Sequence, residues 1–279
     1  MTAVATGVLA RLRATLPGLS PTLGRIAEVA LESPHKVLYS TVTELAEAAS
    51  SSEGSVIRFC KDLGFSGFQD FKLALATDLA ASQTTPLALD EPDNLVSEAV
   101  RHAQAAVRET GQLLDLATVE GVAARILAAT RTDVVGVGAS GMIAAYVHYK
   151  LLRLGLTVQV FTDPHLAAMS ASSLTGQSVA IGVSSSGSVI DTVAALRTAK
   201  EAGAFTVALT NRARSPLTAV SDAVLLASSP ESPLTGGAVP SKIGQLLVLE
   251  VLFSALLGQR EGGLKFLQRT AESVVDKSY

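Results

Sequence analysis

Two short runs rich in serine and glycine have the side chains and the placement to bind an anion. The first is Ser184-Ser185-Ser186-Gly187-Ser188, with four serines in five residues, between an apolar run at 178–183 and a helical stretch at 188–202. Serine hydroxyls and the free amides at a helix N-terminus together bind a phosphate dianion without Arg or Lys. The simpler alternative is that the serines cap the helix that begins near Ser188.

The second run, Gly136-Val137-Gly138-Ala139-Ser140-Gly141, follows an apolar run at 133–137 and opens a helical stretch at 141–154. Its glycines allow a phosphate to approach the helix N-terminus closely. Asp163 stands 22 residues beyond Gly141, at the spacing where dinucleotide-binding folds keep the acid that holds the ribose. The run therefore predicts an anion site without choosing the anion, and a merely tight strand–helix turn is the alternative.

The elements that must position both runs form a repeating pattern. Five apolar runs alternate with helical stretches at 141–154, 166–174, 188–202 and 215–220, and helical stretches at 94–116, 119–130, 241–257 and 263–276 flank them. The five runs are 133–137, 157–162, 178–183, 205–210 and 222–227. Apolar strands alternating with helices predict a parallel sheet that helices cover on both faces. Ligands of such sheets bind outside the carboxyl ends of neighbouring strands, so we expect the serine and glycine turns to converge there.

Other polar residues give weaker signals. His165 opens a helix beyond the second apolar run and is expected to face the same cleft, although a lone histidine is more often a surface residue. Ser241-Lys242 begins the last long helix, where it is either a ligand contact or a start signal. His148, His165 and Glu250 are the available acid–base groups, and none stands in a recognisable catalytic motif.

Residues before about 85 are predicted to be helical, over 20–33, 42–49, 51–63 and 67–81. The region 42–63 has the form of a helix-turn-helix, whose second helix enters the DNA major groove. We predict that its polar face contacts DNA through Ser52, Ser55, Arg58 and Lys61. An ordinary helical hairpin is the alternative, because residues 1–85 hold seven Lys/Arg and eight Asp/Glu.

Composition limits the class of protein. The 279 residues are 48% hydrophobic and 17% charged, with a net charge of −3 and a single cysteine. These values predict a folded cytoplasmic protein without an internal disulfide, and no stretch is interpreted as transmembrane. We expect a helix-turn-helix domain at 1–81, a linker at 82–93 and an α/β domain at 94–279.

These features resemble a known family. Residues 19–80 look like the N-terminal domain of RpiR-family bacterial transcription regulators, most specifically over Ser55–Phe68, followed by Phe71-Lys72. Residues 130–257 look like the SIS (sugar isomerase) domain of that family, which implies a flavodoxin-like, five-stranded parallel sheet that binds a phosphosugar. The family's phosphate loop usually reads Ser-x-Ser-Gly-x-Thr, and Val189 replaces the threonine here.

The resemblance implies a DNA-binding regulator of sugar metabolism, not an enzyme, whose effector is a sugar phosphate. The expected effector-binding residues are Gly138, Ser140, Ser184, Ser185, Ser186, Ser188, His165 and Ser241. A homodimer or homotetramer on a palindrome-like operator is expected, with no metal, cofactor or membrane partner. The alternatives are a regulator that senses NAD(H) through Gly136–Gly141, or a sugar-phosphate isomerase or lyase.

Overall fold

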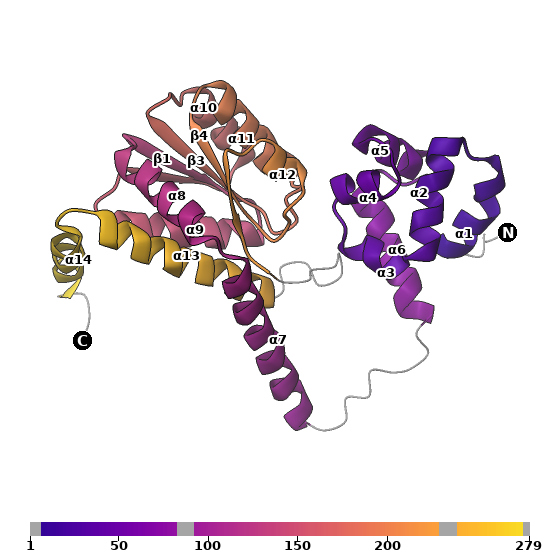
Figure 1. Cartoon of the computed structure of the whole chain (residues 1–279), viewed down its shortest axis with the longest axis horizontal. Helices are drawn as coiled ribbons and strands as arrows, with labels where there is room; N and C mark the ends of the chain where they lie inside the picture. Colours follow the sequence, from indigo (N-terminus) through magenta and orange to yellow (C-terminus); the bar gives the residue numbers. More distant parts are fainter. Residues whose placement is uncertain (1–6, 83–91, 229–238, 276–279) are drawn as a thin grey trace. The chain divides into compact units, whose positions relative to one another are not determined.

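The structure, a computed structural model, describes residues 7–82, 92–228 and 239–275. Two compact units make up the fold, and the boundary along the chain falls inside α7 (Pro92–Leu113), between Val100 and Arg101. Figure 1 shows the helical first unit and the α/β second unit. Residues 83–91 of the expected linker lie outside the described residues, so the limits 1–81, 82–93 and 94–279 stay a prediction.

The described part of the first unit is built from helices and contains the four that the sequence predicts. They are α1 (Val8–Thr15), α2 (Pro21–Glu32), α3 (Pro34–Tyr39), α4 (Val42–Ala48), α5 (Glu53–Asp62) and α6 (Phe68–Ser82), with a 3₁₀ turn at Leu16–Gly18. The prediction omitted α1 and α3. Pro34 ends α2 as expected, but it is also the first residue of α3, where its fixed φ suits a helix start.

Local signals fix the ends of the helix pair α4–α5. Thr41 forms a capping box with Glu44 at the start of α4, and the Ser52 hydroxyl accepts a hydrogen bond from the Ser55 amide at the start of α5. Gly64 follows α5 with φ +83°, a left-handed conformation that glycine adopts without strain. The predicted stop at Gly64 is confirmed.

Aromatic packing holds α5 against α6. Phe59 and Phe71 are fully buried, and their rings meet edge to face with centroids 5.7 Å apart. Phe65 packs edge to face on Phe71 at 5.5 Å. As predicted, Cys60 lies on the packed side of α5 and is fully buried. Burial raises the pKa of the Cys60 thiol to about 12, because a thiolate is poorly solvated among apolar side chains.

The second unit contains a five-stranded parallel sheet in the order β2-β1-β3-β4-β5. Its strands are β1 (Arg131–Val135), β2 (Val158–Phe161), β3 (Ser178–Val183), β4 (Phe205–Thr210) and β5 (Ala223–Leu226). All four pairings are parallel, with Val135 opposite both Phe161 and Gly182. This order confirms the flavodoxin-like fold, and its topological switch point lies between β1 and β3.

Helices cover both faces of this sheet (Figure 1). They are α8 (Leu116–Ala128), α9 (Ala139–Arg153), α10 (Pro164–Ser172), α11 (Ile190–Glu201), α12 (Pro216–Ala219) and α13 (Val239–Gln259), and α14 (Gly263–Glu272) packs on α9 and α13. Helices α8, α9 and α13 share one apolar core with the sheet, and α10, α11 and α12 share the other. The second core is rich in alanine, which lets α10 and α11 approach the strands closely.

Residues Ser241–Gln259 of α13 are long and apolar enough to cross a membrane by length and composition alone. Four of them, Val248, Leu249, Leu252 and Leu256, are buried in the core that α13 shares with the sheet. A core helix of a folded domain meets the same criteria, so this finding does not indicate a membrane span.

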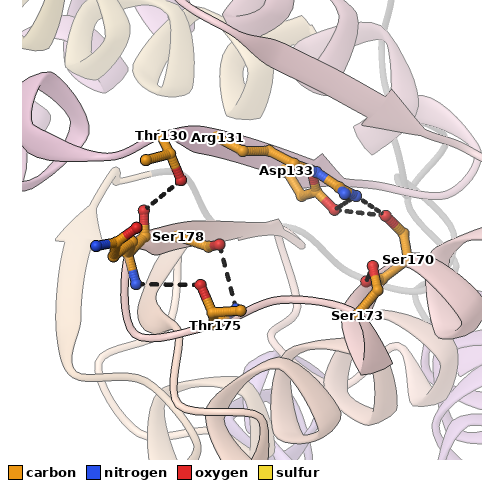
Figure 2. A network of polar contacts seen from close by, with 8 residues as sticks. Thr130, Arg131, Asp133, Ser170, Ser173, Thr175 and Ser178 are labelled. Carbon is orange, nitrogen blue, oxygen red and sulfur yellow. Dashed lines mark hydrogen bonds and ion pairs between the residues drawn. The ribbon is translucent and has the colours of Figure 1, made fainter.

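A buried ionic network ties α10 to β1 (Figure 2). The Asp133 side chain is 3% exposed and receives two hydrogen bonds of 2.7 Å from the Arg131 guanidinium. The Ser170 hydroxyl on α10 donates to the same carboxylate at 2.6 Å. The Arg131 guanidinium also contacts the Ser170 hydroxyl. The carboxylate is thus satisfied where water does not reach it.

We expect Arg131→Ala to lower the stability of the second unit by about 3–5 kcal/mol at neutral pH, because it leaves the Asp133 carboxylate buried without its cation. Urea denaturation combined with hydrogen exchange in β1 and α10 measures the loss. Arg197→Ala removes an exposed arginine from α11 and is the matched control. Equal stability of the two variants would contradict this assignment.

The Cys60 thiol provides a second test, for the first unit. Because the thiol is buried and protonated, we expect a water-soluble maleimide at pH 8 to label it at least about 100-fold more slowly than free cysteine. Mass spectrometry follows the labelling, and the same protein in 6 M urea, where full reactivity is expected, is the control. Labelling of the native protein at the free-thiol rate would show that the α5–α6 core is open.

Candidate functional site

The serine and glycine turns leave adjacent strands at one edge of the sheet. The run Gly136–Gly141 follows β1, the run Ser184–Ser188 follows β3, and β1 and β3 are paired. The two turns therefore flank the switch point, as the sequence predicts. Ser140 and Ser184 are buried, whereas Ser186 and Ser188 are partly exposed and Gly138 is exposed.

Both helices that follow these turns begin without a side-chain cap. The N-cap of α9 is Gly138, with φ +58°, and the N-cap of α11 is Val189; neither position has a capping hydrogen bond from its side chain. The alternative that the serines cap α11 is therefore wrong. Two helix N-termini with partial positive charge lie at the same edge, which is the arrangement that binds anions.

Hydrogen bonds hold the serine turn in a defined shape. The Ser184 amide donates to the carbonyl of Leu209, and the Asn211 amide donates to the carbonyl of Ser185, so the turn rests on the end of β4. Gly187 has φ +62°, and a Cβ there would meet the Ser215 Oγ at 2.2 Å, so only glycine fits. The Ser184 Oγ is buried and has no hydrogen-bond partner among the described residues.

Lys242, which the sequence offers together with Ser241 as a ligand contact, lies at this turn. The Lys242 ammonium on α13 donates to the Ser185 Oγ at 2.6 Å, and the Gln245 Nε2 donates to the same oxygen at 3.2 Å. Lys242 stands next to the predicted residue Ser241, which is fully buried. A positive charge therefore stands beside the serine hydroxyls.

Two further predicted residues follow β2, the neighbour of β1 on its other side. His165 is exposed in the first turn of α10. Asp163, the acid expected for a dinucleotide ribose, is the N-cap of α10, and its carboxylate accepts a hydrogen bond of 2.9 Å from the Leu166 amide. The presence of Asp163 at this spacing is therefore explained by its role as the N-cap of α10.

The acid–base candidate Glu250 is already paired. Its carboxylate accepts hydrogen bonds from the Tyr146 hydroxyl at 2.6 Å and from the Lys150 ammonium at 2.9 Å. These bonds lower the pKa of Glu250, with the Tyr146 bond as the largest cause, and the same bond raises the pKa of Tyr146 to about 12. Glu250 thus links α13 to α9. Within 7–82, 92–228 and 239–275, no group of three His, Cys, Asp or Glu side chains could hold a metal ion.

In the first unit, the predicted face of α5 is open to solvent. Arg58 and Lys61 are exposed, and Ser55 is partly exposed. The Arg58 side chain is 77% exposed and lies 3.7 Å from the Asp62 carboxylate, an exposed pair that contributes little and leaves the guanidinium free to rotate. The exposed Ser52 is the N-cap of α5, and its hydroxyl lies 3.0 Å from the Ser55 hydroxyl.

The turn that precedes α5 is held by Arg25, a residue that the sequence analysis did not identify. Ser50 has φ +46°, an uncommon conformation for a residue other than glycine. The Arg25 guanidinium on α2 donates to the carbonyls of Ala49 and Ser50, both at 2.9 Å. Arg25 therefore fixes the angle at which α5 leaves α4.

The first unit is helical and exposes a polar helix, and the α/β unit that follows has an anion-type site. This combination is typical of a two-domain regulator that binds DNA with one unit and a small molecule with the other. Comparison with known families agrees. Residues 6–82 match the helix-turn-helix domain of the rpiR family, and residues 125–255 match the SIS domain.

Similar proteins extend the match over nearly the whole chain. An uncharacterized HTH-type transcriptional regulator of Caldanaerobacter subterraneus is 35% identical and covers 96% of both chains. The HTH-type transcriptional regulator RpiR of Escherichia coli is 30% identical over 88% of this chain and 85% of its own. The structure of Vibrio vulnificus NanR complexed with ManNAc-6P superposes with a TM-score of 0.90 at 35% identity, covering 98% of this chain and 100% of NanR. The chain belongs to the RpiR family of HTH-type transcriptional regulators with a C-terminal SIS domain.

Proposed function

We propose that this RpiR-family regulator controls sugar metabolism by binding a phosphorylated sugar as its effector. One observation carries the proposal: two uncapped helix N-termini, serine hydroxyls and the Lys242 ammonium all lie at the carboxyl ends of the paired strands β1 and β3. A phosphate dianion satisfies such an arrangement, because it accepts several hydrogen bonds at once and carries the charge that the helix ends favour.

The proposed phosphate site comprises the two turns and the start of α13. Ser140, Ser184, Ser186 and Ser188 supply hydroxyls, the region around Gly138 supplies backbone amides, and Lys242 supplies charge through its position at Ser185. His165 and Ser241 are proposed as further effector-binding residues at the edge of this site. The complex of NanR with ManNAc-6P supports a sugar phosphate as the class of ligand.

The same site is proposed to sense the sugar phosphate without converting it. Glu250, the carboxylate considered for acid–base work, is engaged by Tyr146 and Lys150. The relatives are named as transcriptional regulators, which supports a cytoplasmic protein that acts on DNA.

DNA binding is proposed to use Ser52, Ser55, Arg58 and Lys61 on a double-stranded operator. One short helix reaches few base edges, so a homodimer or homotetramer that presents two copies to a palindrome-like site supports useful specificity. Exposed Val96, Val100 and Val107 lie on one face of α7. Such an apolar stripe is suited to an interface between copies of the chain.

We expect Ser186→Ala to weaken binding of the effector about 10- to 100-fold, because a hydroxyl bond to a charged phosphate contributes roughly 1.5–3 kcal/mol. A thermal-shift screen of sugar phosphates selects the ligand, and isothermal titration calorimetry measures its affinity. The unphosphorylated sugar is expected to bind far more weakly.

Two other serine variants sharpen this measurement. Ser140→Ala removes a hydroxyl from the glycine turn and is expected to weaken binding similarly, whereas Ser172→Ala changes an exposed serine of α10 and is the matched control. Equal affinities in all of these variants, or tight binding of NAD(H) alone, would overturn the phosphosugar site.

Another prediction concerns binding of the operator DNA. Arg58→Ala is expected to weaken operator binding by about 1–3 kcal/mol per half-site, or roughly 5- to 150-fold, because it removes a direct contact to a base edge. Fluorescence anisotropy on a DNA site selected from random sequences measures the change, and effector affinity should stay the same.

Arg13→Ala, which removes an exposed arginine from α1, is the control for the loss of one positive charge. If Arg58 contacts only phosphate, its loss should weaken all DNA sequences equally and lower the salt dependence by about one charge. Operator affinity that is unchanged in Arg58→Ala would show that this face of α5 does not contact DNA.

A further inference from the structure

Buried polar atoms without a partner gather around the serine turn. The described residues contain five such side-chain atoms, and three of them are the Ser184 Oγ, the Asn211 Nδ2 and the Gln245 Oε1. Ser184 belongs to the turn itself, and both amides belong to residues that contact it. Folded proteins rarely leave such atoms unpaired, so a cluster of them at a candidate site indicates a missing polar partner.

Asn211 and Gln245 form one connected pair beside the turn. Asn211 follows β4, and its backbone amide donates to the Ser185 carbonyl at 3.2 Å. Gln245, which is fully buried on α13, donates from its Nε2 to the Asn211 Oδ1 at 3.1 Å and to the Ser185 Oγ at 3.2 Å. The pair is therefore joined to the same serine that accepts from Lys242.

The remaining hydrogen-bonding capacity of the pair is specific. Both donors of the Gln245 amide group are used, which leaves its Oε1 as an acceptor. The Asn211 Oδ1 is used, which leaves its Nδ2 as a donor. One free donor and one free acceptor therefore belong to neighbouring amides, and a partner that both accepts and donates would satisfy them together.

We propose that Asn211 and Gln245 recognise a hydroxyl group on the carbon skeleton of the effector, close to its phosphate. A hydroxyl accepts from the Asn211 Nδ2 and donates to the Gln245 Oε1, whereas a carboxylate has no proton to give and would face the Gln245 oxygen. Because the Gln245 amide and the Asn211 backbone N–H both contact Ser185, the recognised hydroxyl lies on the part of the sugar next to the phosphate. This inference rests on the proposed function and adds the determinant that separates a sugar phosphate from phosphate alone.

Lys242 and Gln245 approach the Ser185 Oγ from one side of α13, one turn apart. A phosphate at the serine turn competes with Ser185 for the Lys242 ammonium. Since Lys242 and Gln245 share Ser185 as a partner, the phosphate and the recognised hydroxyl occupy adjoining positions in this proposal.

The test compares two ligands across matched variants by calorimetry. The ligands are the tightest-binding hexose 6-phosphate of a panel that includes N-acetylmannosamine 6-phosphate, and inorganic phosphate. Gln245→Leu removes the acceptor at similar volume, and Asn211→Asp replaces the donor by an acceptor at a partly exposed position that tolerates change. Ser172→Ala, which changes an exposed serine of α10, is the control.

We expect Gln245→Leu to weaken binding of the sugar phosphate about 10- to 100-fold while inorganic phosphate changes less than about 3-fold. Asn211→Asp should lower the affinity for the sugar phosphate more than that for phosphate. Ser186→Ala should weaken both ligands, and Ser172→Ala neither. A series of deoxy analogues completes a thermodynamic cycle between protein and ligand changes. The analogue that lacks the recognised hydroxyl should bind wild type and Gln245→Leu with equal affinity.

The possible failures are distinguishable. If wild type binds the sugar phosphate but the amide variants lose both ligands equally, or neither, then the pair only holds structural water and this inference is overturned. If every deoxy analogue binds as the parent sugar does while the acetamido analogue alone responds to Gln245→Leu, the hydroxyl assignment is wrong. If wild type binds neither a hexose phosphate nor phosphate, the proposed function itself fails.

Discussion

Pairing of β1 with β3 is the constraint on which the chemistry of the second unit depends. The chain leaves β1 to form β2 on one side and then returns across β1 to form β3 on the other, so the turns after β1 and β3 diverge to opposite faces of the sheet. A crevice between diverging connections follows from topology, whatever residues fill it. The local sequence then determines what the crevice holds: glycine keeps the backbone close, serines supply hydroxyls, and neither helix has a side-chain cap that would compete for the same amides.

In the first unit the corresponding constraint is the fixed packing of α5. Its apolar face, with Phe59 and Cys60, is fully buried, so its polar face has one possible direction. Arg25 adds a second restraint by donating to the carbonyls of the turn at Ala49 and Ser50, which holds Ser50 in a left-handed conformation. A recognition helix benefits from such rigidity, because hydrogen bonds to base edges require fixed geometry.

The sequence predicted the features that depend on local or periodic signals. The apolar runs predicted all five strands, and the ranges 42–49 and 51–63 agree with the helix pair to within a few residues of the ends that Thr41, Ser52 and Gly64 set. Helices α1 and α3 were missed because they are short, and Pro34 signals an end as readily as a start. The start of the last long helix at Ser241-Lys242 was offered as a ligand contact, but its partner Ser185, 57 positions earlier, could not be predicted because only the fold brings the two together. Asn211 and Gln245 escaped for the same reason.

The composition of the candidate site explains how one fold serves both sensing and chemistry. A catalyst of sugar isomerisation needs a carboxylate or imidazole that is free to exchange a proton with a carbon of the sugar. Here the carboxylate of α13 that the sequence offered, Glu250, has two hydrogen-bond partners that lower its pKa and hold it in the link between α13 and α9. The serine turn itself offers hydroxyls, amides and one ammonium, a set suited to holding an anion, and the exposed His165 imidazole follows the neighbouring strand β2. A set of this composition suits the proposed role of holding an effector reversibly, which is what a regulator of transcription requires.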